Sequence, residues 1–314
     1  MRSTSLRTVR ETVEAVRKEV KKVVVGEDEL IDGLITSLLC GEHVLIEGPP
    51  GSAKTLAAKA FALSIGATFK RVQMTVETMP ADIVGFYAYT LTGDRRFVKG
   101  PVFSNILLVD ELNRAPPRTQ SALLEAMQER QVTIEGDSYE LPYPFVVVAT
   151  QVPYGAVGTY ALPEVLVDRF AIRIKSRYVE PELEVEVLSR TDLIELLPIE
   201  RVVTLGEIID LISAVKRVKV DRDVASYMVN IVNYLRGHEA VESGPSIRAS
   251  VHLYKASRAR AAMEGRDYVI PDDVKRVAAL VLEHRFRIKT RAEMRGLSPE
   301  DLVEEALESV PVPK

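Results

Sequence analysis

Cysteine is nearly missing from this 314-residue chain, which has only Cys40. A single thiol excludes a framework of internal disulfide bonds and the small secreted domains that depend on one. Histidine is also scarce, and His43, His238, His252 and His284 show none of the spacings of a Cys/His zinc site. We therefore interpret the histidines as surface or packed residues.

Long apolar runs and an excess of positive charge are missing as well. No stretch approaches the roughly 18 apolar residues that indicate a membrane-spanning helix, and Met1–Arg7 lacks the apolar core of a signal peptide. We therefore expect a soluble, cytoplasmic protein. The net charge is −4 and the isoelectric point is near 5.8, whereas nucleic-acid-binding domains are normally basic. Composition thus gives a nucleic-acid partner no support.

Short apolar runs separated by helical patterns make up the first 180 or so residues. This alternation predicts an α/β fold with a parallel five-stranded sheet covered on both faces by helices. The chain also has enough apolar residues, 46%, to build a core without a metal or disulfide. The predicted strands are 44–46, 69–72, 106–109, 145–149 and 171–174.

The last third of the chain carries helical patterns instead. Val224, Tyr227, Met228 and Ile231 begin one apolar stripe at helical spacing, and a second stripe follows the start signal at Pro271. We therefore predict two parts: an α/β core over residues 1–195 and an all-α helical subdomain over residues 196–314.

Two β-hairpins are predicted to interrupt the sheet. The first pairs residues 86–89 with 95–98 around a turn at 92–94. The second pairs residues 131–135 with 139–141 around a Gly136-Asp137 turn, because glycine next to aspartate between alternating residues is typical of hairpins.

A phosphate-binding loop is the strongest local signal, because it matches G-x-x-x-x-G-K-[ST] in full and lies between a predicted strand and a predicted helix. In such loops glycines turn backbone N–H groups toward phosphate oxygens, the lysine adds positive charge, and the hydroxyl binds Mg²⁺. The matching residues are Gly48, Pro49, Pro50, Gly51, Ser52, Ala53, Lys54 and Thr55. Leu56, which follows them, belongs to the same predicted nucleotide site.

Two carboxylates end the predicted strand at residues 106–109. Asp110 is the predicted partner of Mg²⁺, together with Thr55, and Glu111 is the predicted general base that polarises the attacking water. Acidic residues next to a phosphate site predict hydrolysis of ATP in addition to binding.

The chain resembles the MoxR family of AAA+ ATPases. The resemblance covers about residues 20 to 290 and rests on four segments. They are the run from Asp110-Glu111-Leu112-Asn113-Arg114 to Glu129, the segment Gly158–Glu164 with Asp168-Arg169-Phe170, the segment Gly244–Ala249, and the segment Gly265–Val274.

The resemblance implies an AAA+ core with a helical lid and assigns further roles. Val25 and Gly26 fall where the family contacts adenine. Arg169 falls at the arginine finger, which acts on the nucleotide of the neighbouring subunit, and Arg248 falls at the second sensor, which reaches the phosphates from the lid. Guanidinium groups suit both roles because they stay charged and bind phosphate oxygens in pairs.

The resemblance also implies partners. These are a homo-oligomeric, hexameric ring, a von Willebrand factor A domain protein, and client proteins that the ring remodels or activates. Two other interpretations stay open: a DNA translocase, for which the only supporting feature is a hairpin carrying Arg95, Arg96 and Lys99, and an ATP-binding switch with little hydrolysis.

One departure from the family pattern motivates the switch. The family usually has Ala-Thr-Gln-Asn-Pro after the fourth strand, with the asparagine as first sensor, whereas this chain has Val152 at that position. Valine cannot orient water through a hydrogen bond, so either Thr150 or Gln151 replaces the asparagine or hydrolysis is slow.

Overall fold

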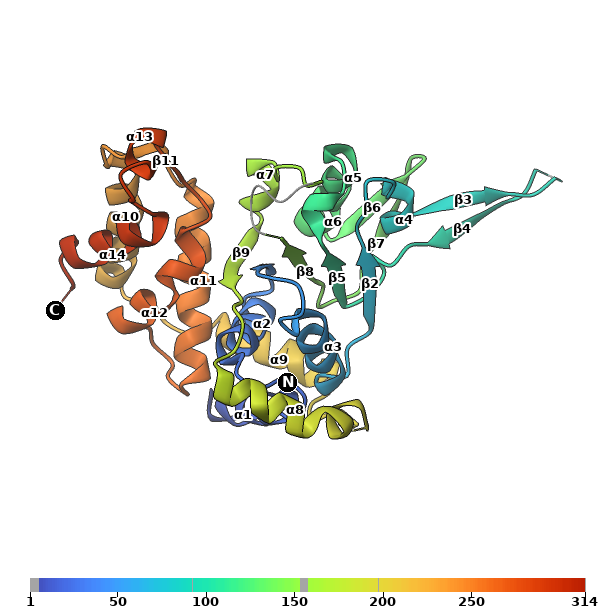
Figure 1. Cartoon of the computed structure of the whole chain (residues 1–314), viewed down its shortest axis with the longest axis horizontal. Coiled ribbons are helices and arrows are strands. Elements are labelled where there is room, and N and C mark those ends of the chain that lie inside the picture. The colour runs from blue at the N-terminus through green and yellow to red at the C-terminus, as the bar shows by residue number, and fades with distance from the viewer. Residues whose placement is uncertain (1–5, 92, 153–157, 197, 314) are drawn as a thin grey trace.

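A five-stranded parallel sheet forms the centre of the molecule, as a computed structural model shows for residues 6–91, 93–152, 158–196 and 198–313 (Figure 1). The sheet confirms the predicted α/β class. Its strands, in spatial order, are β2 (Phe69–Gln73), β5 (Ile106–Asp110), β8 (Val146–Gln151), β1 (His43–Glu47) and β9 (Phe170–Lys175). The predicted strands each overlap one of these.

Helices bury the sheet on both faces, which explains why the inner strands β5 and β8 have apolar residues at successive positions. Ile106 and Leu108 belong to one apolar cluster, and their neighbours Leu107 and Val109 belong to another. Such alternation follows from the two-residue repeat of a strand. The first cluster includes α1 (Leu6–Val20), α2 (Asp28–Cys40) and α3 (Lys54–Ser64), and the second includes η1 (Leu112–Arg114) and α6 (Leu123–Glu129). The short helices α4 (Pro80–Val84) and α5 (Pro117–Ser121) lie on the second side of the sheet (Figure 1).

Both predicted hairpins are present. Strands β3 (Gly85–Tyr89) and β4 (Arg95–Lys99) form a long arm that projects from the body of the molecule (Figure 1); residue 92 of the predicted turn lies outside the described residues. The second hairpin pairs β6 (Gln131–Ile134) with β7 (Asp137–Glu140).

The predicted Gly136-Asp137 turn was wrong by one residue. Asp137 already pairs with Ile134, and the two turn residues are Glu135 and Gly136, with φ of 51° and 91°. A two-residue hairpin loop of this kind requires positive φ at both central positions, so Glu135 adopts a conformation that sequence preference disfavours.

The C-terminal part is helical, with two small additions that the sequence analysis did not predict. Strand β10 (Val241–Ser243) pairs antiparallel with β11 (Arg287–Ile288), and Lys219 forms an isolated parallel bridge with Tyr268. Its helices are α10 (Arg222–Gly237), α11 (Ile247–Met263), α12 (Pro271–Leu282), α13 (Thr290–Glu293) and α14 (Pro299–Ser309). Within the described residues, no helix combines the length and apolarity needed to cross a bilayer.

Two helices connect the core and the lid. Helix α8 (Pro181–Leu196) follows β9, and α9 (Leu205–Val215) contacts α1 and α2 as well as α11 of the lid. The domain boundary at residue 195 stays a prediction. Helix α11 also contacts α1 and α2, so the lid is packed directly against the core.

Close packing of α2 on β9 leads to a stability prediction. A Cβ added at Gly33 would lie 2.2 Å from Cδ1 and 2.9 Å from Cγ1 of Ile174, a side chain that is 1% exposed. We expect Gly33→Ala to lower the free energy of unfolding by about 1–3 kcal/mol, because an overpacked core must shift side chains or backbone. Gly237→Ala, where no atom lies within 4 Å of the added Cβ, is the control. Equal denaturation midpoints for the two variants would contradict this account.

Candidate nucleotide-binding site

The carboxyl ends of β1, β5 and β8 meet at one edge of the sheet, where they surround a cavity of about 360 Å³. We call it the phosphate cavity. Ligands of open α/β sheets bind at this edge. Its lining joins the phosphate loop to the end of β5 and includes Gly48, Pro50, Gly51, Ser52, Ala53, Lys54, Thr55, Leu56, Asp110, Glu111, Thr150, Gln151 and Val152.

The phosphate loop has the conformation that its glycines allow. Gly51 has φ 84°, and a Cβ at Gly48 would lie 2.5 Å from the backbone oxygen of Ser176. Ala53 also has a positive φ, 54°, and such a residue stores strain of the kind found at binding sites. Helix α3 begins at the next residue, Lys54, so the loop leads into the positive end of a helix dipole.

Lys54 lies within the loop and close to several carboxylates. Its Nζ donates to the backbone oxygen of Gly48 at 3.2 Å and to Oγ of Ser52 at 2.9 Å. Burial lowers the pKa of its amine, and the charges of Asp110, Glu27 and Glu111 oppose that shift. The lysine therefore lies in the electrostatic field of both acidic residues predicted from the sequence.

Asp110 and Glu111 are held by neighbours on three elements. Asp110 accepts hydrogen bonds from Oγ1 of Thr150 at 2.6 Å, from Oγ1 of Thr55 at 3.3 Å, and from Nη2 of Arg71 at 2.7 Å. The backbone N–H of Glu111 donates to the same Thr150 hydroxyl at 2.8 Å. Thr150 therefore contacts both acidic residues, through the carboxylate of Asp110 and the backbone of Glu111.

The donors around Asp110 fit Mg²⁺. A buried carboxylate beside a hydroxyl offers two hard oxygen ligands, and Mg²⁺ in nucleotide sites is commonly bound through one or two protein oxygens with the substrate phosphates. Thr55 and Asp110 are the residues that could hold it.

Val152 occupies the predicted first-sensor position at the wall of the phosphate cavity. The Asn113 side chain fixes its backbone: Nδ2 donates to the Val152 oxygen at 3.0 Å, and Oδ1 accepts from the Val152 N–H at 3.2 Å. Gln151, the second alternative, donates to Glu47 at 3.1 Å, so its amide is directed to the end of β1. Pro153 lies outside the described residues.

A larger, mainly apolar cavity of about 850 Å³ adjoins the phosphate loop. Val25 and Leu56 line it together with Tyr178, and it shares Gly51, Ser52 and Ala53 with the phosphate cavity. An apolar cavity beside a phosphate site suits a purine base. Gly26 does not line this cavity, but a Cβ at its position would lie 2.8 Å from Val179 on the cavity wall.

Arg169 and Arg248 face a different cavity, of about 590 Å³, which we call the arginine cavity. No residue of the phosphate loop lines it, so the structure does not bring either arginine to the phosphate loop of its own chain. Arg248 forms an ion pair with Asp168 at 2.6 Å, and Nη2 of Arg169 bonds to the side chain of Gln128. Burial, and then the charge of Arg248, lower the pKa of Arg169.

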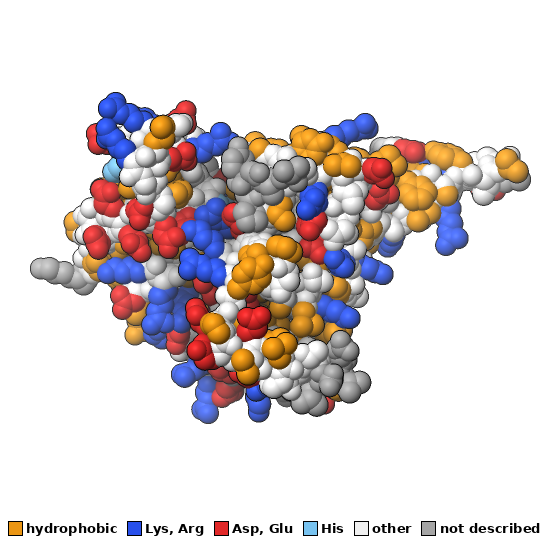
Figure 2. Space-filling view, in the orientation of Figure 1, with side chains coloured by type: hydrophobic (Ala, Val, Ile, Leu, Met, Phe, Trp, Pro, Cys, Tyr) orange, Lys and Arg blue, Asp and Glu red, His pale blue; other side chains and the backbone are white. Residues whose placement is uncertain are grey.

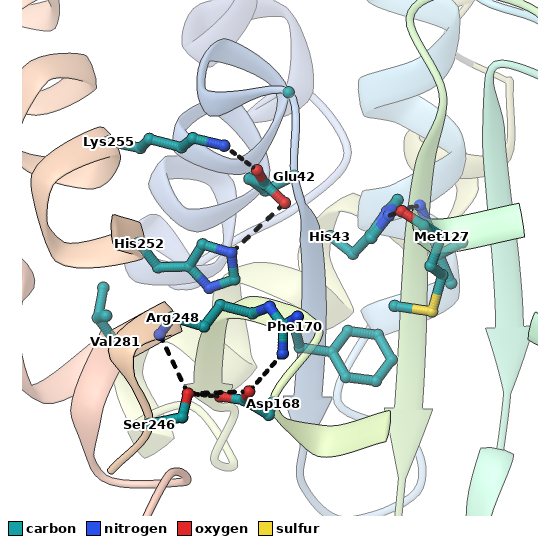
Figure 3. Close-up of polar contacts among 12 residues, drawn as sticks. Glu42, His43, Met127, Asp168, Phe170, Ser246, Arg248, His252, Lys255 and Val281 are labelled. Atoms are coloured by element: carbon teal, nitrogen blue, oxygen red, sulfur yellow. Dashed lines mark hydrogen bonds and ion pairs between the residues drawn. The ribbon is translucent and has the colours of Figure 1, made fainter. Parts of the chain in front are cut away.

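Glu42, His252 and Lys255 line the same arginine cavity, and Figure 3 shows the polar contacts among them. Glu42 pairs with Lys255 at 2.5 Å and lies 3.5 Å from Nε2 of His252. Burial tends to raise the pKa of Glu42, but His252 and Lys255 outweigh it and lower that pKa to about 2. Burial lowers the pKa of His252 itself.

Known proteins match both halves of the chain. Residues 43–172 match the model of the AAA family, described as ATPases associated with various cellular activities, and residues 233–306 match the AAA lid domain. Chaperone MoxR1 of Mycobacterium tuberculosis is 40% identical over 314 residues, covering 96% of this chain and 83% of MoxR1. YeaC of Bacillus subtilis is 40% identical over 300 residues, covering 94% of this chain and 93% of YeaC. A crystal structure from Cytophaga hutchinsonii, described as a candidate ATPase, superimposes with a TM-score of 0.91 at 36% identity over 98% and 97% of the two chains.

The chain belongs to the MoxR family of AAA+ ATPases. Membership confirms the predicted core-and-lid fold and implies nucleotide binding. The roles of individual residues stay predictions.

Three polar residues of this MoxR-family site were given no role from the sequence. Arg71 of β2 lines the phosphate cavity and binds Asp110, and Asp168 and Arg285 lie beside the arginine cavity. Arg71 lies 39 residues from its partner and Arg285 lies 117 from Asp168. Local spacing carries no signal for such pairs.

Proposed function

We propose that this chain binds ATP with Mg²⁺ in the phosphate cavity and hydrolyses it at the boundaries between subunits of a homo-oligomeric, hexameric ring. One observation carries the proposal: the phosphate loop and both acidic residues line one cavity, whereas Arg169 and Arg248 line another. Each chain thus has two incomplete halves of an ATPase site, and head-to-tail contacts between identical chains, which generate rings, would join them.

Each residue has a definite task in such a joint site. The backbone of the phosphate loop and Lys54 hold the phosphates, and Thr55 with Asp110 would hold Mg²⁺, which supplies positive charge to the phosphate oxygens. Glu111 accepts a proton from the attacking water. Arg169 and Arg248 stabilise negative charge on the γ-phosphate in the neighbouring subunit.

Dependence on protein concentration tests the shared site. We expect ATP turnover per chain to rise steeply as the concentration passes the range in which the ring forms, with analytical ultracentrifugation run on the same samples. Turnover per chain that stays constant while the protein changes from monomer to oligomer would contradict the proposal.

The projecting hairpin supports a client-remodelling role for the ring. Phe86, Tyr89 and Leu91 of the β3–β4 arm are 48%, 61% and 109% exposed, and hydrophobic side chains cover much of that arm (Figure 2). Exposed apolar groups of this kind often mark protein-binding surfaces. A relative named as a chaperone supports the same role, and the von Willebrand factor A partner remains part of the proposal through the family resemblance.

The β3–β4 arm gives little support to the DNA-translocase alternative. Arg95 pairs with Asp137 of the second hairpin at 2.9 Å, and Nζ of Lys99 lies 5.0 Å from the ring centre of Phe103. Two of its three cationic side chains therefore have contacts within the molecule. ATPase activity that DNA stimulates, and that falls steeply with salt, would revive this alternative.

Val152 is the observation that favours a slow ATP-binding switch, and its replacement tests that alternative. We expect measurable turnover in the wild type and a gain of at most about tenfold in Val152→Asn, which amounts to about 1.4 kcal/mol of barrier. The reason is that Thr150 already contacts both acidic residues. Steady-state phosphate release at saturating ATP is the measurement. A wild type without turnover that Val152→Asn activates would favour the switch.

A further inference from the structure

Arg285 is a buried cation between the core and the lid. Its side chain is 0% exposed, and each of its three nitrogens donates a hydrogen bond. Nε donates to the Val281 oxygen at 2.7 Å, Nη1 to the backbone oxygen and Oδ1 of Asp168 at 3.0 and 2.5 Å, and Nη2 to the Phe170 oxygen and to Nδ1 of His252, the latter at 2.5 Å. A guanidinium used in this way cannot move out to a ligand, so its role is to hold other groups.

Asp168, which Figure 3 shows beside Ser246 and Arg248, is the main group that it holds. While Oδ1 accepts from Arg285, Oδ2 accepts from Nη1 of Arg248 at 2.6 Å. The hydroxyl of Ser246 donates to the same carboxylate at 3.0 and 3.1 Å, and Ser246 caps the start of α11 by accepting the N–H of Arg248. One carboxylate therefore fixes both the side chain of Arg248 and the helix turn that carries it.

Arg169, the next residue along the chain, faces the same arginine cavity as Arg248. Two guanidinium groups in one cavity repel each other, and a carboxylate beside both reduces that repulsion. Asp168 lies in the core, between the short helix α7 (Glu164–Val167) and β9, whereas Arg285 and Arg248 belong to the lid. The contact therefore ties the orientation of the arginines to the position of the lid on the core.

We propose that Asp168 and Arg285 are positioning residues for ATP hydrolysis: the buried Arg285 fixes Asp168, and Asp168 holds Arg248 beside Arg169 in the orientation presented to the nucleotide of the neighbouring subunit. The inference rests on the proposed function, in which both arginines act across the subunit boundary. A movement of the lid that separates Arg285 from Asp168 therefore also withdraws Arg248 from this orientation.

The test is Asp168→Asn, which keeps the shape of the side chain and removes its charge. Nucleotide affinity, measured by titration of a fluorescent ATP analogue, is expected to equal that of the wild type, because Asp168 does not line the phosphate cavity. Turnover of the assembled ring is expected to fall about 100-fold, as for other small misplacements of groups at a reaction centre. Ser246→Ala removes the hydroxyl that donates to the Asp168 carboxylate. It should lose less turnover than Asp168→Asn, also without a change in nucleotide affinity, and it replaces Asp168→Asn in the test if that variant does not fold.

Mixing two variants in one ring distinguishes a loss of arginine positioning from a general loss of the folded structure. Asp168→Asn subunits retain the phosphate cavity and Glu111→Gln subunits retain the arginine cavity, so mixed rings of the two variants should recover turnover. The matched control is Asp273→Asn, which breaks an Asp–Arg pair within the lid, between the buried Asp273 and Arg266 at 2.6 Å. It is expected to lower thermal stability and to leave the turnover of the folded ring unchanged.

Three results would overturn the inference. The first is wild-type turnover in Asp168→Asn, and the second is a loss of nucleotide affinity in Asp168→Asn as large as its loss of turnover. The third is that Asp168→Asn mixed with Glu111→Gln recovers no turnover, while Arg169→Ala mixed with Glu111→Gln does. If Arg169→Ala mixed with Glu111→Gln also stays inactive, the shared site itself is wrong, and the inference fails with it.

Discussion

Glu111→Gln is expected to lower ATP turnover by about 1,000-fold, within the range for loss of a general base, and to leave ATP affinity close to that of the wild type. The amide keeps the size of the carboxylate but cannot accept a proton from water. Glu111 follows the buried end of β5 and lines the phosphate cavity, where its carboxylate pairs with Nε of Arg114 at 2.6 Å.

Phosphate release at saturating ATP and equilibrium binding of a fluorescent ATP analogue measure the two effects separately. Glu182→Gln, at an exposed position of α8, is the control and should behave as the wild type. Turnover that survives in Glu111→Gln would remove this residue from the mechanism. A loss of binding without a loss of turnover per bound nucleotide would make it a binding residue instead.

Arg169→Ala is expected to lower turnover by about 1,000-fold or more, which is the lower end of the effect of an arginine finger. Nucleotide affinity of the single chain should not change, since Arg169 lines the arginine cavity and not the phosphate cavity. The side chain is positioned to leave its present contact, because it bonds to the side chain of Gln128 and, among the described residues, its buried Nε has no hydrogen-bond partner.

Arg276→Ala is the matched control, because Arg276 is an arginine of the lid that is 62% exposed and pairs with Glu264 at 3.7 Å. Ring formation is measured on both variants, so that a failure to assemble is not mistaken for a failure to hydrolyse. An Arg169→Ala ring with normal turnover would contradict the assigned role.

The sequence was informative where a function depends on neighbours along the chain. The phosphate loop, the acidic pair at the end of β5 and the apolar stripes of α10 and α12 are local patterns, and the structure has each within the predicted element. The sheet was predictable for the same reason, since strands buried on both faces are short and apolar.

Features that depend on spatial order were not predictable. The order β2-β5-β8-β1-β9 differs from the order along the chain, so nothing local indicated that Arg71 of β2 would bind Asp110 of β5. The positions of Arg169 and Arg248 in a cavity separate from the phosphate loop follow from how the lid packs on the core. The turn at Glu135 was missed because the required positive φ is adopted by a residue that rarely has it.

Mixing Arg169→Ala with Glu111→Gln tests the shared active site most directly. Each variant alone is expected to be almost inactive, but in mixed rings some boundaries join an intact phosphate cavity to an intact arginine cavity. For equal amounts and random head-to-tail assembly, about one quarter of the boundaries are complete, so turnover should recover to about one quarter of the wild type. A mixture that forms rings and remains as inactive as its components would contradict the account.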